Sequence, residues 1–166
     1  MQDRFKSRVW DKTTSTMHYN DFVITATGYV AKLEDLPEVA RKRGIKLNAG
    51  VFLINQTNID FDKNCTVMLS TGLSDKNGKE IYDGDILNLY VSSKKLYRYQ
   101  VKYEIGSFML VSQDEIFDFK NVWNDNVYPL SQLYFEYQNE ENCIDQCEVV
   151  GNIYENPELL EVGILA

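Results

Sequence analysis

Four carboxylates lie within eleven positions near the middle of the chain, at Asp75, Glu80, Asp83 and Asp85. Paired carboxylates can act as a general acid and base, or they can bind a hard divalent cation. A calcium-binding loop, however, needs a longer series of oxygen ligands that ends in a bidentate glutamate, and this sequence lacks that series. Aspartate and glycine are also typical of tight turns, where the aspartate side chain bonds to nearby main-chain groups. We therefore interpret Asp83-Gly84-Asp85 as a turn, with a metal-dependent hydrolase built on Glu80, Asp83 and Asp85 as an alternative.

The other residue types that could do chemistry are few. His18 is the only histidine, so a catalytic triad or a pair of histidine metal ligands is nearly excluded, and we expect a half-exposed strand residue there. Of the cysteines Cys65, Cys143 and Cys147, the last two lack the spacing of a metal-binding pair. We interpret all three as reduced thiols, with a redox pair at Cys143 and Cys147 as the alternative. Without a phosphate loop or a nucleophile elbow, the sequence favours a protein that is not an enzyme and has no cofactor.

A second group of candidate residues lies near the N-terminus. Arg4, Lys6, Arg8 and Trp10 alternate with other residues, so a strand would place them on one face. Cations interleaved with a ring could bind single-stranded nucleic acid. We favour an exposed edge strand whose charges discourage aggregation, and we keep a nucleic-acid-associated protein as the alternative.

Charge is distributed unevenly along the 166 residues. The net charge is −8, yet residues 1–110 carry 16 basic and 13 acidic side chains, whereas residues 111–166 carry 12 acidic side chains and Lys120 alone. An acidic C-terminal third repels phosphate backbones, which disfavours nucleic acid as its partner. No apolar run reaches the roughly 18 residues of a membrane helix, and residues 1–10 lack the core of a signal peptide. We expect a cytoplasmic protein with no membrane partner.

The elements that position these residues read mainly as β-strands. Asn77-Gly78 is a strong hairpin signal, because both residues tolerate a positive φ. One short helix is expected from Asp35 to Gly44, and a second at residues 129–137, where a strand also fits the spacing of the apolar residues. A terminal helical turn is expected at residues 156–161. The strands are expected at residues 3–10, 17–19, 22–30, 45–54, 64–70, 80–82, 86–91, 97–104, 108–112 and 148–154.

These patterns predict a mainly β fold. We expect an antiparallel meander that curls toward a small barrel, with two or three short helices packed against it. The length suits a single domain spanning residues 1–166, with its acidic third at about residues 111–166.

Three segments resemble the YopX family of phage and prophage proteins. They are RFKSRVWDK at residues 4–12, TGLSDKNGKEIYDGDI at residues 71–86 and VVGNIYENPELL at residues 149–160. The first departs from the family pattern in register, with Val9 in place of a small residue. The resemblance implies a small cytoplasmic protein of an infected or lysogenic bacterium, with self-association, and it brings no catalytic residues.

The expected function is therefore binding rather than catalysis. The chain has 11 tyrosines, and tyrosine supplies interface area at a low entropy cost. We expect a phage accessory protein that acts as a homo-oligomer and meets a phage or host protein. The candidate binding residues are Arg4, Lys6, Arg8, Trp10, Glu80, Tyr82, Asp83 and Asp85.

Overall fold

The computed structural model describes residues 6–19, 22–24, 30–32, 64–91, 95–104, 106–112, 127–137 and 143–161. Internal contacts group the chain into two compact units. The first contains Lys6 and the described residues from Met68 onward, and the second contains those from Ser7 to Val67. The helix expected from Asp35 to Gly44, the strand expected at residues 45–54 and the candidate residue Arg4 lie outside the described residues.

In the second unit, two short antiparallel pairs are described. β1 (Ser7–Asp11) pairs with β2 (Thr16–His18), with Trp10 opposite Met17. The turn between them starts at Asp11, whose Oδ1 accepts hydrogen bonds from the main-chain N–H groups of Thr13 and Thr14. This arrangement is the local aspartate turn that favours a chain reversal.

The second pair corrects an expectation. β3 (Phe22–Ile24) and β4 (Val30–Lys32) run antiparallel with Phe22 opposite Lys32, so the single strand expected at residues 22–30 is wrong. Threonine and aliphatic residues indicate extended structure in general, and they do not say where an extended chain reverses.

The first unit starts with a strand that is shared by both units. β5 (Cys65–Asp75) begins in the second unit and continues into the first, where it pairs with antiparallel β6 (Glu80–Tyr82) and parallel β11 (Cys143–Ile144). The turn between β5 and β6 contains Asn77-Gly78, as the sequence predicts. Gly78 has φ of 77° and donates its N–H to the carbonyl of Asp75 at 2.9 Å. Only a residue that tolerates positive φ closes this turn without strain.

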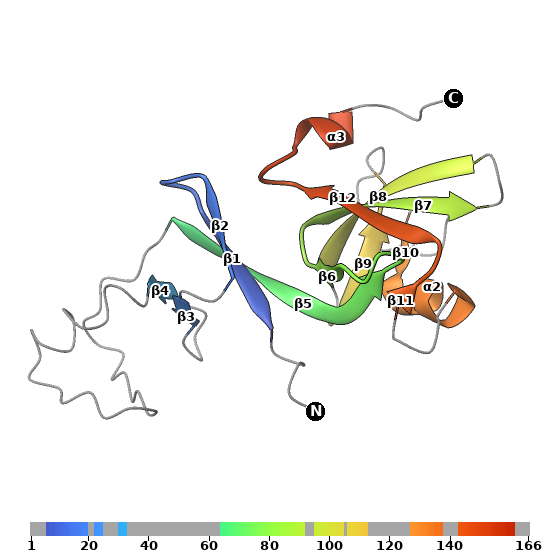
Figure 1. The fold of residues 1–166 in the computed structure, drawn as a ribbon, viewed down its shortest axis with the longest axis horizontal. Helices are drawn as coiled ribbons and strands as arrows, with labels where there is room; N and C mark the ends of the chain where they lie inside the picture. The colour runs from blue at the N-terminus through green and yellow to red at the C-terminus, as the bar shows by residue number, and fades with distance from the viewer. Residues whose placement is uncertain are drawn as a thin grey trace, which may run out of the picture. The chain divides into compact units, whose positions relative to one another are not determined.

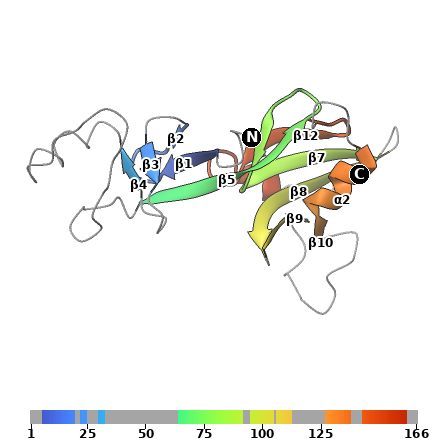
Figure 2. The ribbon, with the colours of Figure 1, turned by 90° about the horizontal axis from the view of Figure 1, so that it is seen from below.

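Five antiparallel strands form the main sheet of this unit. Their order is β10 (Val127–Pro129), β9 (Ser107–Val111), β8 (Lys95–Glu104), β7 (Asp85–Val91) and β12 (Cys147–Asn152). Figure 2 shows β7, β8 and β9 side by side. The short connections between β7, β8 and β9 make the meander that was expected from the alternating sequence.

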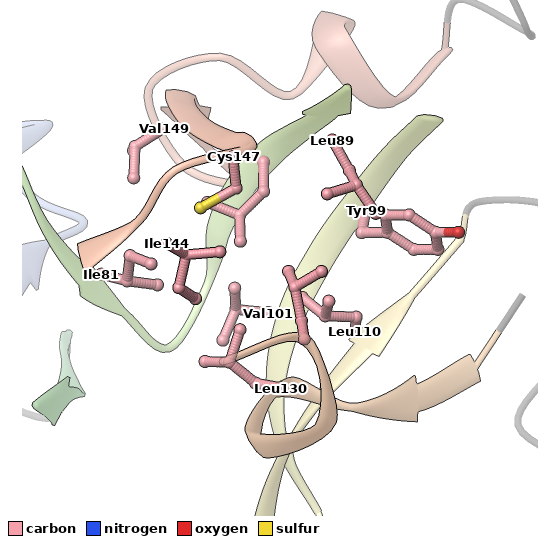
Figure 3. Packing of buried hydrophobic residues seen from close by; sticks show 11 residues of the cluster. Ile81, Leu89, Tyr99, Val101, Leu110, Leu130, Ile144, Cys147 and Val149 are labelled. Atoms are coloured by element: carbon pink, nitrogen blue, oxygen red, sulfur yellow. The ribbon is translucent and has the colours of Figure 1, made fainter. Parts of the chain in front are cut away.

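One face of this sheet carries the hydrophobic core. Leu87 and Leu89 of β7 lie opposite Tyr99 and Tyr97 of β8, and the buried cluster also contains Val101, Leu110, Ile144 and Cys147. Figure 3 shows the packing of this cluster. α2 (Leu130–Tyr137) covers it with Leu130 and Leu133, which are both buried. The helix expected at residues 129–137 is therefore confirmed.

The mainly β class is confirmed, but the expected curling toward a barrel is wrong. The described strands form separate open sheets, as Figure 1 shows. The Asp75-Lys76 turn accounts for this in physical terms, because it occupies the outer edge of β12, which a barrel would have to pair. Asp75 accepts the N–H of Val149 at 2.9 Å, and Lys76 donates its N–H to the Cys147 carbonyl at 3.0 Å.

Candidate functional site

The structure brings three of the sequence-predicted residues together around Glu80. Lys6 is placed beside β5 because its carbonyl accepts the N–H of Ser70 at 2.9 Å. Its ammonium Nζ lies 3.5 Å from Glu80 Oε2, and the Tyr82 hydroxyl donates to that same oxygen at 3.0 Å. The Ser70 hydroxyl donates to Glu80 Oε1. We call Lys6, Ser70, Glu80 and Tyr82 the Glu80 cluster.

The Glu80 cluster is a closed hydrogen-bond network. Both carboxylate oxygens of Glu80 accept a hydroxyl proton, and one of them also faces an ammonium group. A carboxylate with these partners holds β5, β6 and the chain at Lys6 in register. A metal ion could bind Glu80 only by displacing the two hydroxyl groups and the ammonium group. Among the described residues, no group of three or more His, Cys, Asp or Glu side chains is placed to hold a metal ion.

Asp83 covers an open strand edge. β8 continues past the end of β7, and its main chain there needs partners. Gly84 donates its N–H to the Val101 carbonyl at 2.9 Å, and Asp83 Oδ1 accepts the N–H of Tyr103 at 3.0 Å. The carboxylate thus takes the place of a main-chain carbonyl, which protects the edge from pairing with another chain.

Asp85 is fully buried and fixes the same turn from the inside. Its Oδ2 accepts the N–H of Tyr82 at 2.8 Å. Gly84 has φ of 81°, and a Cβ added there would lie 3.2 Å from the sulfur of Met68. The interpretation of Asp83-Gly84-Asp85 as a turn therefore has a geometric basis in the hydrogen bonds and in the need for glycine.

β1 does not present Arg8 and Trp10 on an exposed face. Arg8 is 3% exposed and Trp10 is 8% exposed, so the expectation of an exposed edge face at these two positions is not met. A nucleic-acid base would have to reach Trp10 to stack on it. His18, opposite Val9, is half-buried in its strand.

The closing segment of the chain is built around Asn152 and Gly151. Asn152 Oδ1 accepts the N–H groups of Tyr154 and Glu155 at 3.0 and 2.9 Å, and its carbonyl accepts the N–H of Asn156 at 2.9 Å. A Cβ on Gly151 would lie 2.5 Å from Oδ1 of Asn156. Glycine is needed here because the Asn156 side chain lies directly against the main chain of β12.

The segments that resemble the YopX family therefore form the turns and strand contacts described above. A comparison of the whole chain with protein-family patterns tests the resemblance. The pattern of the family described as YopX protein matches residues 6–161. The chain belongs to the YopX family.

Two solved structures are similar to this YopX-family chain. Protein yopX from Bacillus subtilis has 24% identity and a TM-score of 0.50, with 95% of this chain and 98% of that chain covered, and it supports the fold alone. Protein EF1440 from Enterococcus faecalis has 25% identity and a TM-score of 0.46, with 93% and 96% covered. The comparison with curated proteins finds no match. Among the helices that the structure describes, none combines the length and the hydrophobicity of a membrane-spanning segment.

Sequence reasoning missed the part that Asp75 plays in this YopX-family fold. Its buried carboxylate accepts the N–H groups of Asn77 and Lys79 at 2.8 and 2.9 Å through Oδ1, and that of Val149 at 2.9 Å through Oδ2. It therefore ties the β5–β6 turn to β12 across 74 positions of sequence. The Asp-x-Asn-Gly spacing predicts the local bonds, but no sequence signal indicates the distant one.

A second cluster that the sequence did not indicate lies on the surface. Lys76 Nζ lies 2.7 Å from Glu148 Oε2 and 4.3 Å from the centre of the Tyr90 ring, and the Tyr90 hydroxyl donates to Glu148 at 2.9 Å. The hydrogen bond with Glu148 raises the pKa of Lys76, and the hydrogen bonds from Lys76 and Tyr90 lower the pKa of Glu148. Both shifts favour the charged pair, in an exposed position where salt screens it.

The buried cysteines are poorly placed for reaction. Cys147 lies in the core, and burial, followed by the nearby charge of Asp75, raises its pKa to about 12. The thiolate is the nucleophile, so a raised pKa makes the thiol inert at neutral pH. Cys143 is buried as well and Cys65 is half-buried, and the reduced form expected from the sequence stays a prediction.

Proposed function

We propose that this member of the YopX family is a non-enzymatic binding protein. In this proposal it is encoded by a phage or prophage and acts as a homo-oligomer in the cytoplasm of the bacterial host. The observation that carries the proposal is the use of the central carboxylates. Asp75, Asp83 and Asp85 each accept main-chain N–H groups, so the acids best suited to catalysis are engaged in holding turns and strand edges.

The described surface offers contact area in place of a catalytic centre. Large apolar side chains are exposed at Tyr19, Leu69, Tyr90, Tyr103 and Phe135. Tyrosine and phenylalanine bring much area to an interface at little cost in side-chain entropy. Single exposed apolar residues are normal on a monomer, so they support binding only together with the engaged carboxylates.

Self-association is tested by light scattering coupled to size-exclusion chromatography over a range of micromolar concentrations. We expect a mass that is a multiple of the 19.3 kDa of one chain. A protein that stays at 19.3 kDa over the whole range would contradict the homo-oligomer.

Affinity capture from phage-infected cells, with the whole chain as bait, addresses the partner. A phage or host protein retained at higher salt fits the proposal. Turnover of a small substrate by the purified protein would contradict the non-enzymatic part.

A further inference from the structure

The C-terminal end of the first unit is held to the sheet by a polar contact. α3 (Glu158–Glu161) follows β12 after a turn, and we call residues 153–161 the C-terminal strap (Figure 1). Arg98 of β8 donates through Nη1 to the carbonyl of Leu159 at 2.8 Å and through Nε to Oδ1 of Asn88 at 3.0 Å. One guanidinium group therefore joins the sheet to the last turn of the strap.

The strap has little stability of its own. The described main-chain bonds of its helical turn run from Leu159 N–H to the Asn156 carbonyl at 3.0 Å and from Leu160 N–H to the Pro157 carbonyl at 3.1 Å. A helix of this length is far too short to be stable in isolation. Leu159 and Leu160 are only half-buried, so burial of their side chains adds modestly.

The face of the sheet that receives Arg98 is polar where the strap ends, and it is apolar farther along, where Ile86 and Val111 are buried. Asn88 lies opposite Arg98 in the β7–β8 pair, and Asn88 is 8% exposed. The neighbouring residues Leu87 and Tyr99 point to the opposite face, where the core lies. Release of the end of the strap from Arg98 would therefore expose an amide and a guanidinium, and water solvates both groups well.

We infer that the C-terminal strap opens and closes as a unit separate from the sheet, and that Arg98 is the positioning residue that holds it closed. The turn at Asn152 and the hydrogen bond from the Ile153 N–H to the Gly84 carbonyl at 3.0 Å fix the start of the strap, and Arg98 fixes its end. Regions with few buried apolar contacts are the ones that open locally while the rest of a protein stays folded. The strap is thus a built-in cover for the Asn88–Arg98 face, and it does not depend on the oligomer proposed above.

Amide hydrogen exchange on the whole chain tests this inference. In the unmodified protein we expect the amides of Leu159 and Leu160 to exchange faster than those of Leu87 and Val101. Arg98→Ala should accelerate exchange at Leu159 and Leu160 roughly tenfold or more, because a hydrogen bond from a charged donor is removed. The amides of Leu87 and Val101 should not change.

Further variants keep the test decisive if Arg98→Ala folds poorly. Arg98→Lys keeps the cation but cannot bridge Asn88 and Leu159 with a planar fork, so it should accelerate exchange in the strap to a smaller degree. Lys102→Ala, which removes a half-buried cation from the same strand, is the matched control and should leave strap exchange unchanged. Strap amides as slow as Val101 in the unmodified protein, no response to either Arg98 variant, or equal acceleration of strap and core would each overturn the inference.

Discussion

At the scale of single residues, the acidic side chains of the central motif accept hydrogen bonds from main-chain N–H groups. Asp75 is the clearest case, because it is fully buried and its carboxylate accepts three main-chain N–H groups. Asp83 does the same for one N–H group at a half-buried position. A buried N–H group that loses its acceptor costs more than an exposed one, so these two residues should differ in their effect on stability.

Asp75→Asn should lower the free energy of unfolding by about 1–3 kcal/mol, because one amide nitrogen would replace an oxygen and face an N–H donor. Urea denaturation followed by circular dichroism measures the change. Asp83→Asn is the matched control, since it keeps an oxygen for Tyr103, and we expect a change within about 0.5 kcal/mol. Equal effects of the two variants would contradict the role assigned to Asp75.

Cys147 should be almost unreactive in the native protein. With a pKa raised to about 12, its thiolate at pH 8 is on the order of a thousandfold scarcer than that of a free thiol. Alkylation followed by peptide mass spectrometry should label Cys147 only after unfolding in denaturant, and equally fast labelling of the native protein would contradict this.

The same raised pKa has a consequence for stability. Because the native thiol keeps its proton while the unfolded thiol loses it, stability should fall as the pH rises from about 9 toward 12. In a Cys147→Ala variant this part of the pH dependence should be absent.

At the scale of elements, the spacing of the buried residues in α2 distinguishes a helix from a strand. Leu130 and Leu133 are three apart and both lie in the core, whereas Phe135 is 72% exposed. The helical interpretation places Leu130 and Leu133 on one face. A strand would have grouped Leu133 with Phe135, so the burial of these two residues separates the two interpretations.

Leu133→Ala should therefore destabilise the protein by about 2–5 kcal/mol, as expected for a truncated core leucine. Phe135→Ser, two residues along the same helix, should change the free energy of unfolding by no more than about 0.5 kcal/mol. Thermal unfolding of both variants provides the comparison, and a larger effect of Phe135→Ser would show that α2 is oriented differently.

At the scale of the whole molecule, the sequence predicted what depends on local rules. The Asn77-Gly78 turn, the Asp83-Gly84-Asp85 turn and the meander from β7 to β9 all follow from turn chemistry and alternation. The barrel was wrong because strand closure depends on which edges are already occupied, and only the fold reveals that Asp75 reaches Val149. The expectation of a single domain stays a prediction.

The same limit applies to the candidate site. The sequence singled out Glu80 and Tyr82 as candidate residues, but it could not predict that Ser70 completes their network. It also could not predict the burial of Arg8 and Trp10, because the period of a strand says which residues share a face and not what covers that face.

The contact between Gly151 and Asn156 bears on how this family can diverge. A methyl group on residue 151 would collide with the asparagine amide, so the two positions are constrained as a pair. A relative with a larger residue at the first position would need a smaller one at the second, and it would then leave β12 along a different path. Paired change at these two sites is therefore the evolutionary signature to seek when distant sequences are aligned.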